Sequence, residues 1–138
     1  MKHLIGCFLA VIALYSCDSG KSSMKGAPDS VDAKEIANDT VRIANDDLEY
    51  EILIIEPGFN TWLITQPPRG YNGITFLETN NRIYTSTYNL RVYDINFSNK
   101  LYPQTINYEP NIHYGLEVNY MLYNYFKYFE DKYNQRLR

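Results

Sequence analysis

The chain has 138 residues, of which 45% are hydrophobic and 15% aromatic, and its formal net charge is −3 at neutral pH. This length accommodates one small globular core with short extensions. Lys and Arg form no basic block of the kind that neutralises phosphates, so we expect no nucleic-acid partner.

Residues 1–17 have the layout of a bacterial lipoprotein signal. A basic start and a mostly apolar run over 4–14 precede Ser16 and Cys17. The run is shorter than the roughly 20 apolar residues that span a bilayer, which favours a signal peptide cleaved after 1–16. We expect Cys17 to become the lipidated N-terminus. The alternative is an ordinary secretory signal followed by a free thiol.

Lipidation at Cys17 predicts attachment to a membrane through lipid alone. Each buried methylene of an acyl chain contributes about 0.8 kcal/mol, and a second chain makes the anchor effectively permanent. Cys7 follows too short an apolar run to be the modified residue. A single remaining cysteine forms no internal disulfide, so we expect a fold without a covalent crosslink.

Residues 17–47 have the composition of a flexible acidic tether. Ser, Gly, Ala, Asp and Asn predominate and aromatic residues are almost absent, so this segment cannot bury enough apolar area to fold alone. An alternative is one amphipathic helix between Ser30 and Ala44 that forms on contact with a partner. The remaining residues, 48–138, are expected to form one aromatic-rich globular domain.

The domain is predicted to begin with a strand over 49–55, which is rich in Ile and Tyr. Its apolar face consists of Tyr50, Ile52 and Ile54. Pro57 and the glycine after it end the strand. A short helix over 59–65 and a proline-containing loop over 66–70 follow.

The next segment predicts a long helix over 74–97, from apolar residues at helical spacing. These are Ile74, Leu77, Tyr84, Tyr88, Val92 and Ile95. Asn81 interrupts this face, and the β-leaning segment 85–87 weakens the pattern. A second strand is expected over 105–108, and its natural pairing partner is the strand over 49–55.

The last element is predicted to be a helix from Tyr114 onward, with Asn111 able to cap it. Its core stripe consists of Val118, Met121, Leu122, Tyr125, Phe129 and Tyr133. The sequence therefore predicts a small α+β domain. In it, a short antiparallel strand pair packs with two longer amphipathic helices and one short helix.

The opposite face of the last helix carries Leu116, Tyr120 and Tyr123. Either this face is covered by the loop and the first short helix, or it is an exposed aromatic patch. Tyrosine combines a large contact area with a polar tip, and it favours interfaces and sugar rings. Tyr120 and Tyr123, together with Trp62, are therefore the candidate binding residues.

The nucleophile and metal-ligand inventories of the domain are thin. Ser86 and Ser98 lack the glycines of a nucleophile elbow. His113 and Glu117 supply two zinc ligands at most, with Glu109 as an uncertain third. No phosphate-binding or dinucleotide glycine motif is present. We expect no metal and no cofactor.

Paired carboxylates keep one catalytic alternative open. Glycosidases need two acids at a suitable separation, flanked by aromatic residues that stack on sugars. Glu56, Glu109 and Glu117 are the candidates. A domain this small rarely builds the deep cleft that such chemistry uses. A simpler interpretation has Glu109 organise the turn before Pro110, and Glu117 favour the first turn of a helix.

Several segments resemble an uncharacterised family of Bacteroidetes cell-envelope lipoproteins, a domain of unknown function. They are Tyr50 to Ile52, Glu56 to Phe59 with Trp62 and Leu63, Ile106 to Ile112, and Tyr114 to Tyr120. The likeness covers about residues 50–133. It implies a shared fold, a Gram-negative host and attachment to the outer membrane facing the periplasm, but no activity. An acidic residue is common in that family where His113 stands here, which weakens any role for an imidazole.

The sequence thus favours a membrane-anchored envelope lipoprotein that binds rather than catalyses. Its expected partner is another envelope protein, with a glycan as the second choice. A purely structural or assembly role is the next possibility, and glycan hydrolysis by Glu56, Glu109 or Glu117 is the catalytic alternative.

Overall fold

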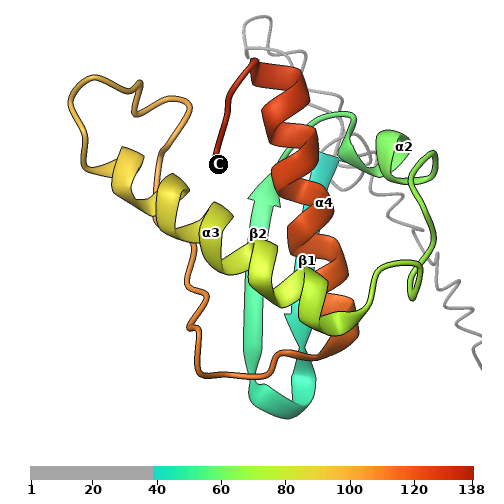
Figure 1. Ribbon diagram of the computed structural model, residues 1–138. Coiled ribbons are helices and arrows are strands. Elements are labelled where there is room, and N and C mark those ends of the chain that lie inside the picture. The colour runs from blue at the N-terminus through green and yellow to red at the C-terminus, as the bar shows by residue number, and fades with distance from the viewer. Residues whose placement is uncertain (1–38) are drawn as a thin grey trace, which may run out of the picture. The chain divides into compact units, whose positions relative to one another are not determined.

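The computed structural model describes residues 39–138, so Cys17 and the predicted signal peptide lie outside the described residues. The elements in chain order are β1 (Thr40–Asn45), the short 3-10 helix η1 (Asp46–Leu48), β2 (Tyr50–Ile55), α2 (Phe59–Leu63), α3 (Ile74–Val92) and α4 (Gly115–Tyr133) (Figure 1). Residues 39–138 thus contain a two-stranded antiparallel sheet and three α-helices, two of them long. The predicted small α+β domain is confirmed.

The strand that pairs with β2 is β1, not the segment 105–108. Thr40 lies opposite Ile55, and Asn45 lies opposite Tyr50. Two side chains of β1, Val41 and Ile43, are almost completely buried. Part of the stretch predicted as tether therefore forms a core strand, and residues 40–45 are not in the alternative helix, whose first part lies outside the described residues.

The prediction of a strand over 105–108 is wrong. This segment does not pair with β2, because its backbone is hydrogen-bonded to a side chain of α3. The Asn89 side chain of α3 accepts a hydrogen bond from Ile106 N at 2.8 Å and donates one to Ile106 O at 2.8 Å. Both main-chain groups of Ile106 are thus taken by one amide side chain. The segment runs beside β2 without joining the sheet.

Helix α4 is the centre of the fold and packs against β1, α2 and α3. Its predicted stripe is confirmed as the core side, with only Tyr133 half-buried. The helix begins at Gly115 with Tyr114 as its N-cap, so the prediction that Asn111 caps it is wrong. Tyr114 O instead accepts a hydrogen bond from the Asn45 side chain at 3.0 Å, which ties the start of α4 to the end of β1.

Helix α3 ends at Val92, earlier than the predicted end at residue 97. The Asp94 carboxylate accepts a hydrogen bond from Asn96 N at 2.9 Å, a local turn that competes with the helical backbone. Ile95, predicted on the apolar face, is 97% exposed. The interrupting Asn81 is completely buried and donates to Asn119 O and Oδ1 of α4, each at 3.0 Å.

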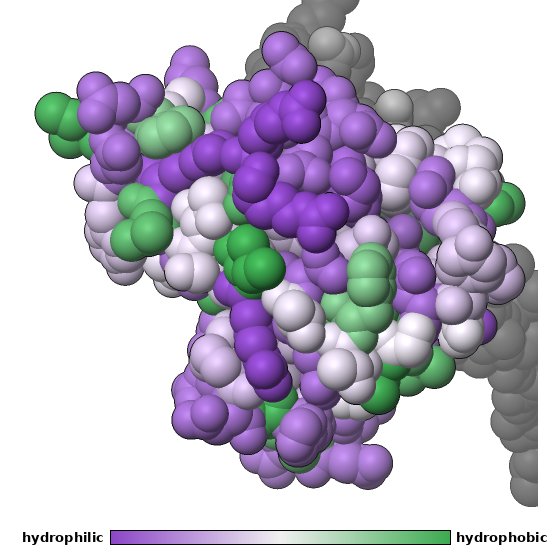
Figure 2. All heavy atoms as spheres, viewed as in Figure 1, coloured by the Kyte–Doolittle hydropathy of each residue, from purple (hydrophilic) through white to green (hydrophobic). Residues whose placement is uncertain are grey.

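The face shown in Figure 2 carries no extended apolar surface. Its hydrophobic residues lie singly or in small groups among hydrophilic ones, as is normal for protein surfaces. Within residues 39–138, no helix has both the length and the apolar character needed to cross a bilayer.

Candidate functional site

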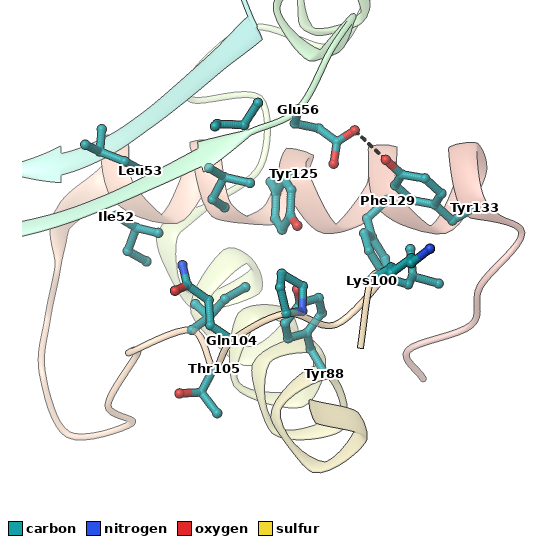
Figure 3. A pocket seen from close by; sticks show the side chains of 15 residues that line it. Ile52, Leu53, Glu56, Tyr88, Lys100, Gln104, Thr105, Tyr125, Phe129 and Tyr133 are labelled. Atoms are coloured by element: carbon teal, nitrogen blue, oxygen red, sulfur yellow. Dashed lines mark hydrogen bonds between the residues drawn. The ribbon is translucent and has the colours of Figure 1, made fainter. Parts of the chain in front are cut away.

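A cavity of about 430 Å³ lies between β2, the segment 100–106 and α4 (Figure 3). We call it the β2 groove. Its lining residues are Ile52, Leu53, Ile54, Ile55, Glu56, Tyr88, Lys100, Leu101, Pro103, Gln104, Thr105, Ile106, Tyr125, Phe129 and Tyr133. Because one wall is a run of consecutive strand residues, the groove follows β2.

The floor of the β2 groove is aromatic and packed into the core. Tyr88 of α3 and Tyr125 and Phe129 of α4 are each at most 3% exposed. The rings of Tyr88 and Phe129 pack edge to face, with centroids 5.4 Å apart. Burial raises the pKa of Tyr88 to about 12 and also raises the pKa of Tyr125. Both hydroxyls therefore stay protonated at neutral pH.

One end of the β2 groove holds a buried acid with fixed partners. Glu56 is 5% exposed, and its Oε1 accepts a hydrogen bond from Tyr133 OH at 3.0 Å (Figure 3). The same oxygen accepts a second hydrogen bond from Lys132 Nζ at 2.7 Å. Burial opposes the charge of Lys132, but the hydrogen bond to Glu56 outweighs it and raises the Lys132 pKa. Burial, followed by Glu56, raises the pKa of Tyr133. Glu56 and Lys132 form an ion pair.

The far wall, 100–106, is held in place by the core. Ile106 is fixed by Asn89, as described above, and Tyr102 packs on Tyr88 with ring centroids 4.9 Å apart. The rim of this wall is polar, because Lys100, Gln104 and Thr105 are exposed. Among residues 39–138, the Lys100 ammonium has no ion-pair partner. The groove therefore has one unneutralised positive charge on its rim.

The face of α4 that carries Tyr120 is covered, so it is not an exposed aromatic patch. Tyr120 is 6% exposed, and its hydroxyl donates to Pro67 O at 3.0 Å. The Arg69 guanidinium lies over its ring, 4.7 Å from the centroid. The loop over 66–70 thus seals this part of the helix.

The other two predicted binding residues also pack within the fold. Trp62 is half-buried against Tyr128 with ring centroids 5.3 Å apart. Tyr123 is half-buried between Phe76 and Tyr84, at 5.6 and 6.1 Å. None of Trp62, Tyr120 and Tyr123 lines the β2 groove.

The three candidate carboxylates do not meet in one described cavity. Glu56 lines the β2 groove, whereas Glu109 and Glu117 do not. Glu117 Oε1 accepts a hydrogen bond from Arg69 Nη2 at 2.7 Å, so it pairs with the loop that covers α4. The groove thus provides a single carboxylate, and that carboxylate is already paired.

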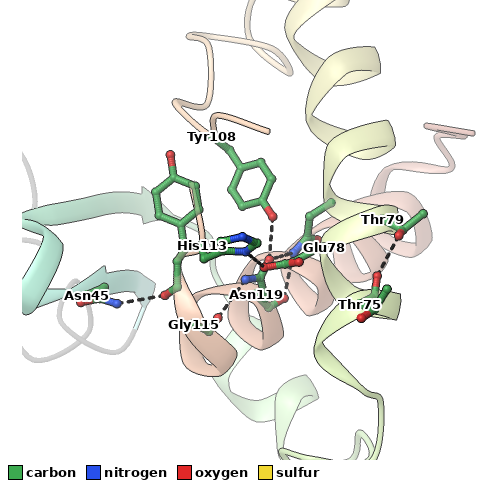
Figure 4. A network of polar contacts seen from close by, with 10 residues as sticks. Asn45, Thr75, Glu78, Thr79, Tyr108, His113, Gly115 and Asn119 are labelled. Atoms are coloured by element: carbon green, nitrogen blue, oxygen red, sulfur yellow. Dashed lines mark hydrogen bonds and ion pairs between the residues drawn. The ribbon is translucent and has the colours of Figure 1, made fainter. Parts of the chain in front are cut away.

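His113 lies outside the groove, with its side chain 83% exposed and its Nδ1 3.1 Å from Glu78 Oε1 (Figure 4). In the part of the chain that the structure describes, no three His, Cys, Asp or Glu residues are grouped to hold a metal ion.

Sequence reasoning missed the groove itself. Glu56 was a candidate, and Tyr125 and Phe129 were predicted as core, but Lys100 and Gln104 carried no signal. The pattern over 105–108 did place that segment beside β2. Nothing in the pattern showed that this segment and β2 would be held apart, because the distance between them depends on the Asn89 side chain of α3.

Residues 5–138 match the family of unknown function DUF6146. No curated protein and no solved structure matches the chain. The family description assigns no activity.

Proposed function

Since the chain belongs to DUF6146, a family without an assigned activity, we propose that it is a lipid-anchored bacterial envelope protein that binds another protein through the β2 groove. The anchor is Cys17, and the membrane is the outer membrane on its periplasmic side. The apolar run before Ser16 and Cys17 supports the anchor. The residues between Cys17 and β1 act as the spacer.

The observation that carries a binding function is a groove whose aromatic floor and far wall are both held by the core. The aromatic floor is packed into the core, and Asn89 holds the far wall. A preformed site spares a complex the cost of ordering its own loops. Aromatic floors with a few polar groups at the rim are typical of recognition sites.

Glycan binding is the second candidate, because Glu56 and Tyr133 offer polar groups to a sugar beside the aromatic floor. Hydrolysis would need a second carboxylate across the bound sugar. If the purified full chain cleaves an envelope glycan, and Glu56→Gln stops the cleavage without unfolding the protein, the non-catalytic proposal is wrong.

The protein-binding proposal is tested by placing a photo-crosslinking residue at Gln104 in the full lipidated chain, in its own host. We expect a discrete crosslinked protein, identified by mass spectrometry, that also binds when both proteins are purified. The matched control carries the crosslinker at Ile64, which is 85% exposed but does not line the groove. Equal crosslinking at both positions, or none at Gln104, would contradict the proposal.

The anchor is tested by metabolic labelling with a fatty acid. We expect the wild type and Cys7→Ala to incorporate label and Cys17→Ala to lose it. Label retained in Cys17→Ala would reject the assignment of the anchor.

A further inference from the structure

The hydrogen bonds of the sheet show which way the β2 backbone points. Glu56 N donates to Asp39 O at 2.6 Å, one step beyond the pair formed by Thr40 and Ile55. In antiparallel ladders, hydrogen-bonded pairs alternate with pairs that are not hydrogen-bonded. The hydrogen-bonded residues of β2 are therefore Ile54, Ile52 and Tyr50. The main-chain groups of Glu51, Leu53 and Ile55 point away from β1.

These outward groups form the free edge of β2. Within residues 39–138 the sheet has two strands, and no loop or turn supplies backbone partners to Glu51, Leu53 or Ile55. Leu53 is 55% exposed and Ile55 is 73% exposed. The run Ile52 to Glu56 lines the β2 groove, so the edge opens into it. An unpaired edge of this kind is a template for another strand.

The far wall leaves this edge open for an extended chain. Asn89 prevents Ile106 from pairing with β2. Glu51 to Ile55 spans about 13 Å at the usual strand rise of about 3.3 Å per residue. An extended peptide of similar length matches that span and alternates its side chains between the aromatic floor and the outer face of the sheet.

The charges of the groove favour an acidic occupant. Glu56 is neutralised by Lys132, whereas Lys100 on the opposite rim has no ion-pair partner among the described residues. A carboxylate on the bound chain can therefore pair with Lys100. A lysine at the same place would be repelled.

We propose that the β2 groove takes an extended segment of a partner protein as a third strand on the free edge of β2. Its apolar side chains face the floor formed by Tyr88, Tyr125 and Phe129, and an acidic side chain faces Lys100. This inference rests on the proposed function and specifies the form of the partner.

The experiment uses the detergent-solubilised full chain and a short fluorescent peptide in which Val and Thr alternate around one Glu. Fluorescence anisotropy should show saturable binding. Methylating alternate backbone nitrogens of the peptide removes ladder donors and should weaken binding about tenfold or more. Replacing the Glu by Lys should also weaken binding, and Lys100→Glu should reverse that preference.

A matched pair of variants tests the strand edge. Leu53→Pro removes an outward N–H, which an edge strand tolerates, and should abolish binding. Leu53→Ala removes the side chain but keeps the N–H, so it should retain most of the affinity. Thermal unfolding checks that both variants fold. If Leu53→Pro does not fold, two other measurements test the strand edge. The N-methylated peptide should bind weakly, and hydrogen exchange of the Leu53 amide should slow in the wild-type complex.

The outcomes separate this inference from the proposed function. No saturable binding of the unmethylated peptide, or equal binding of its N-methylated form, would overturn strand addition. Strand addition would also be overturned if the Leu53→Pro variant still binds a partner captured at Gln104. The protein-binding function would survive that result. If the peptide binds as expected but no envelope protein is captured, the proposed function fails instead. Dimerisation that Leu53→Pro abolishes would assign the edge to a second copy and overturn the partner proposed here.

Discussion

Asn119 joins three parts of the fold through one completely buried side chain. Its Oδ1 accepts hydrogen bonds from Asn81 of α3 at 3.0 Å and from the Tyr108 hydroxyl at 2.7 Å (Figure 4). Its Nδ2 donates to Gly115 O at 2.8 Å. Buried polar groups that are hydrogen-bonded in this way fix the position of one helix against another.

We predict that Asn119→Ala lowers the free energy of unfolding by about 1–3 kcal/mol, because it leaves the Asn81 amide and the Tyr108 hydroxyl without this acceptor. Urea unfolding followed by circular dichroism measures the change. Asn99→Ala, at an exposed asparagine, is the control and should have little effect. Equal effects of the two substitutions would show that the buried contact contributes nothing.

Buried tyrosines predict instability at alkaline pH. Burial raises the Tyr88 pKa from an ordinary value near 10 to about 12, so the folded state holds this proton more tightly than the unfolded state. The resulting stability is complete below about pH 10 and falls as pH rises towards about 12. Unfolding free energies measured over this range should decline less steeply for Tyr88→Phe than for the wild type. Identical slopes would contradict the assignment.

At the scale of elements, the local sequence predicted the strand and the helices whose own apolar pattern shows which side packs against the rest of the fold. The alternation in β2 identifies its inner face, which is half-buried, and the apolar stripe of α4 identifies its core side; the opposite face of α4, which carries Tyr120, is covered as well. Strand β1 was missed because only Val41 and Ile43 mark it within a polar stretch. The groove could not be predicted, because its width depends on a contact between Asn89 and Ile106, 17 positions apart.

We predict that Asn89→Ala loosens the far wall of the groove. Both hydrogen bonds to the Ile106 main chain are lost, so hydrogen exchange at the Ile106 amide should accelerate. The loss should cost about 1–3 kcal/mol of unfolding free energy, and crosslinking at Gln104 should fall. Asn111→Ala, at an exposed asparagine outside the groove lining, serves as the control. Unchanged exchange at Ile106 would show that another contact holds the wall.

For the whole molecule, the position of β1 decides where the folded unit can be shortened. Because the predicted tether reached residue 47, the sequence predicted that the globular domain begins at residue 48. The structure instead places Val41 and Ile43 in the core and makes β1 the only partner of β2 within the described residues.

We predict that a chain of residues 39–138 folds cooperatively, whereas one of 46–138 does not. The shorter chain exposes the core surface that β1 covers and leaves β2 without a ladder. Circular dichroism and thermal unfolding distinguish the two chains. A sharp transition of equal midpoint in both would show that β1 is dispensable.

The order of the elements also has a mechanical consequence. With Cys17 anchored as proposed, any pull between the membrane and a partner held on β2 enters the domain at Thr40, at the open end of the β1 and β2 hairpin. Force applied there opens the hairpin one pair at a time, beginning at the hydrogen bond from Glu56 N to Asp39 O and continuing where Thr40 faces Ile55. The Glu56 side chain is held in turn by Lys132 and Tyr133 of α4. The buried acid at the end of the groove is therefore the clamp that first bears the load.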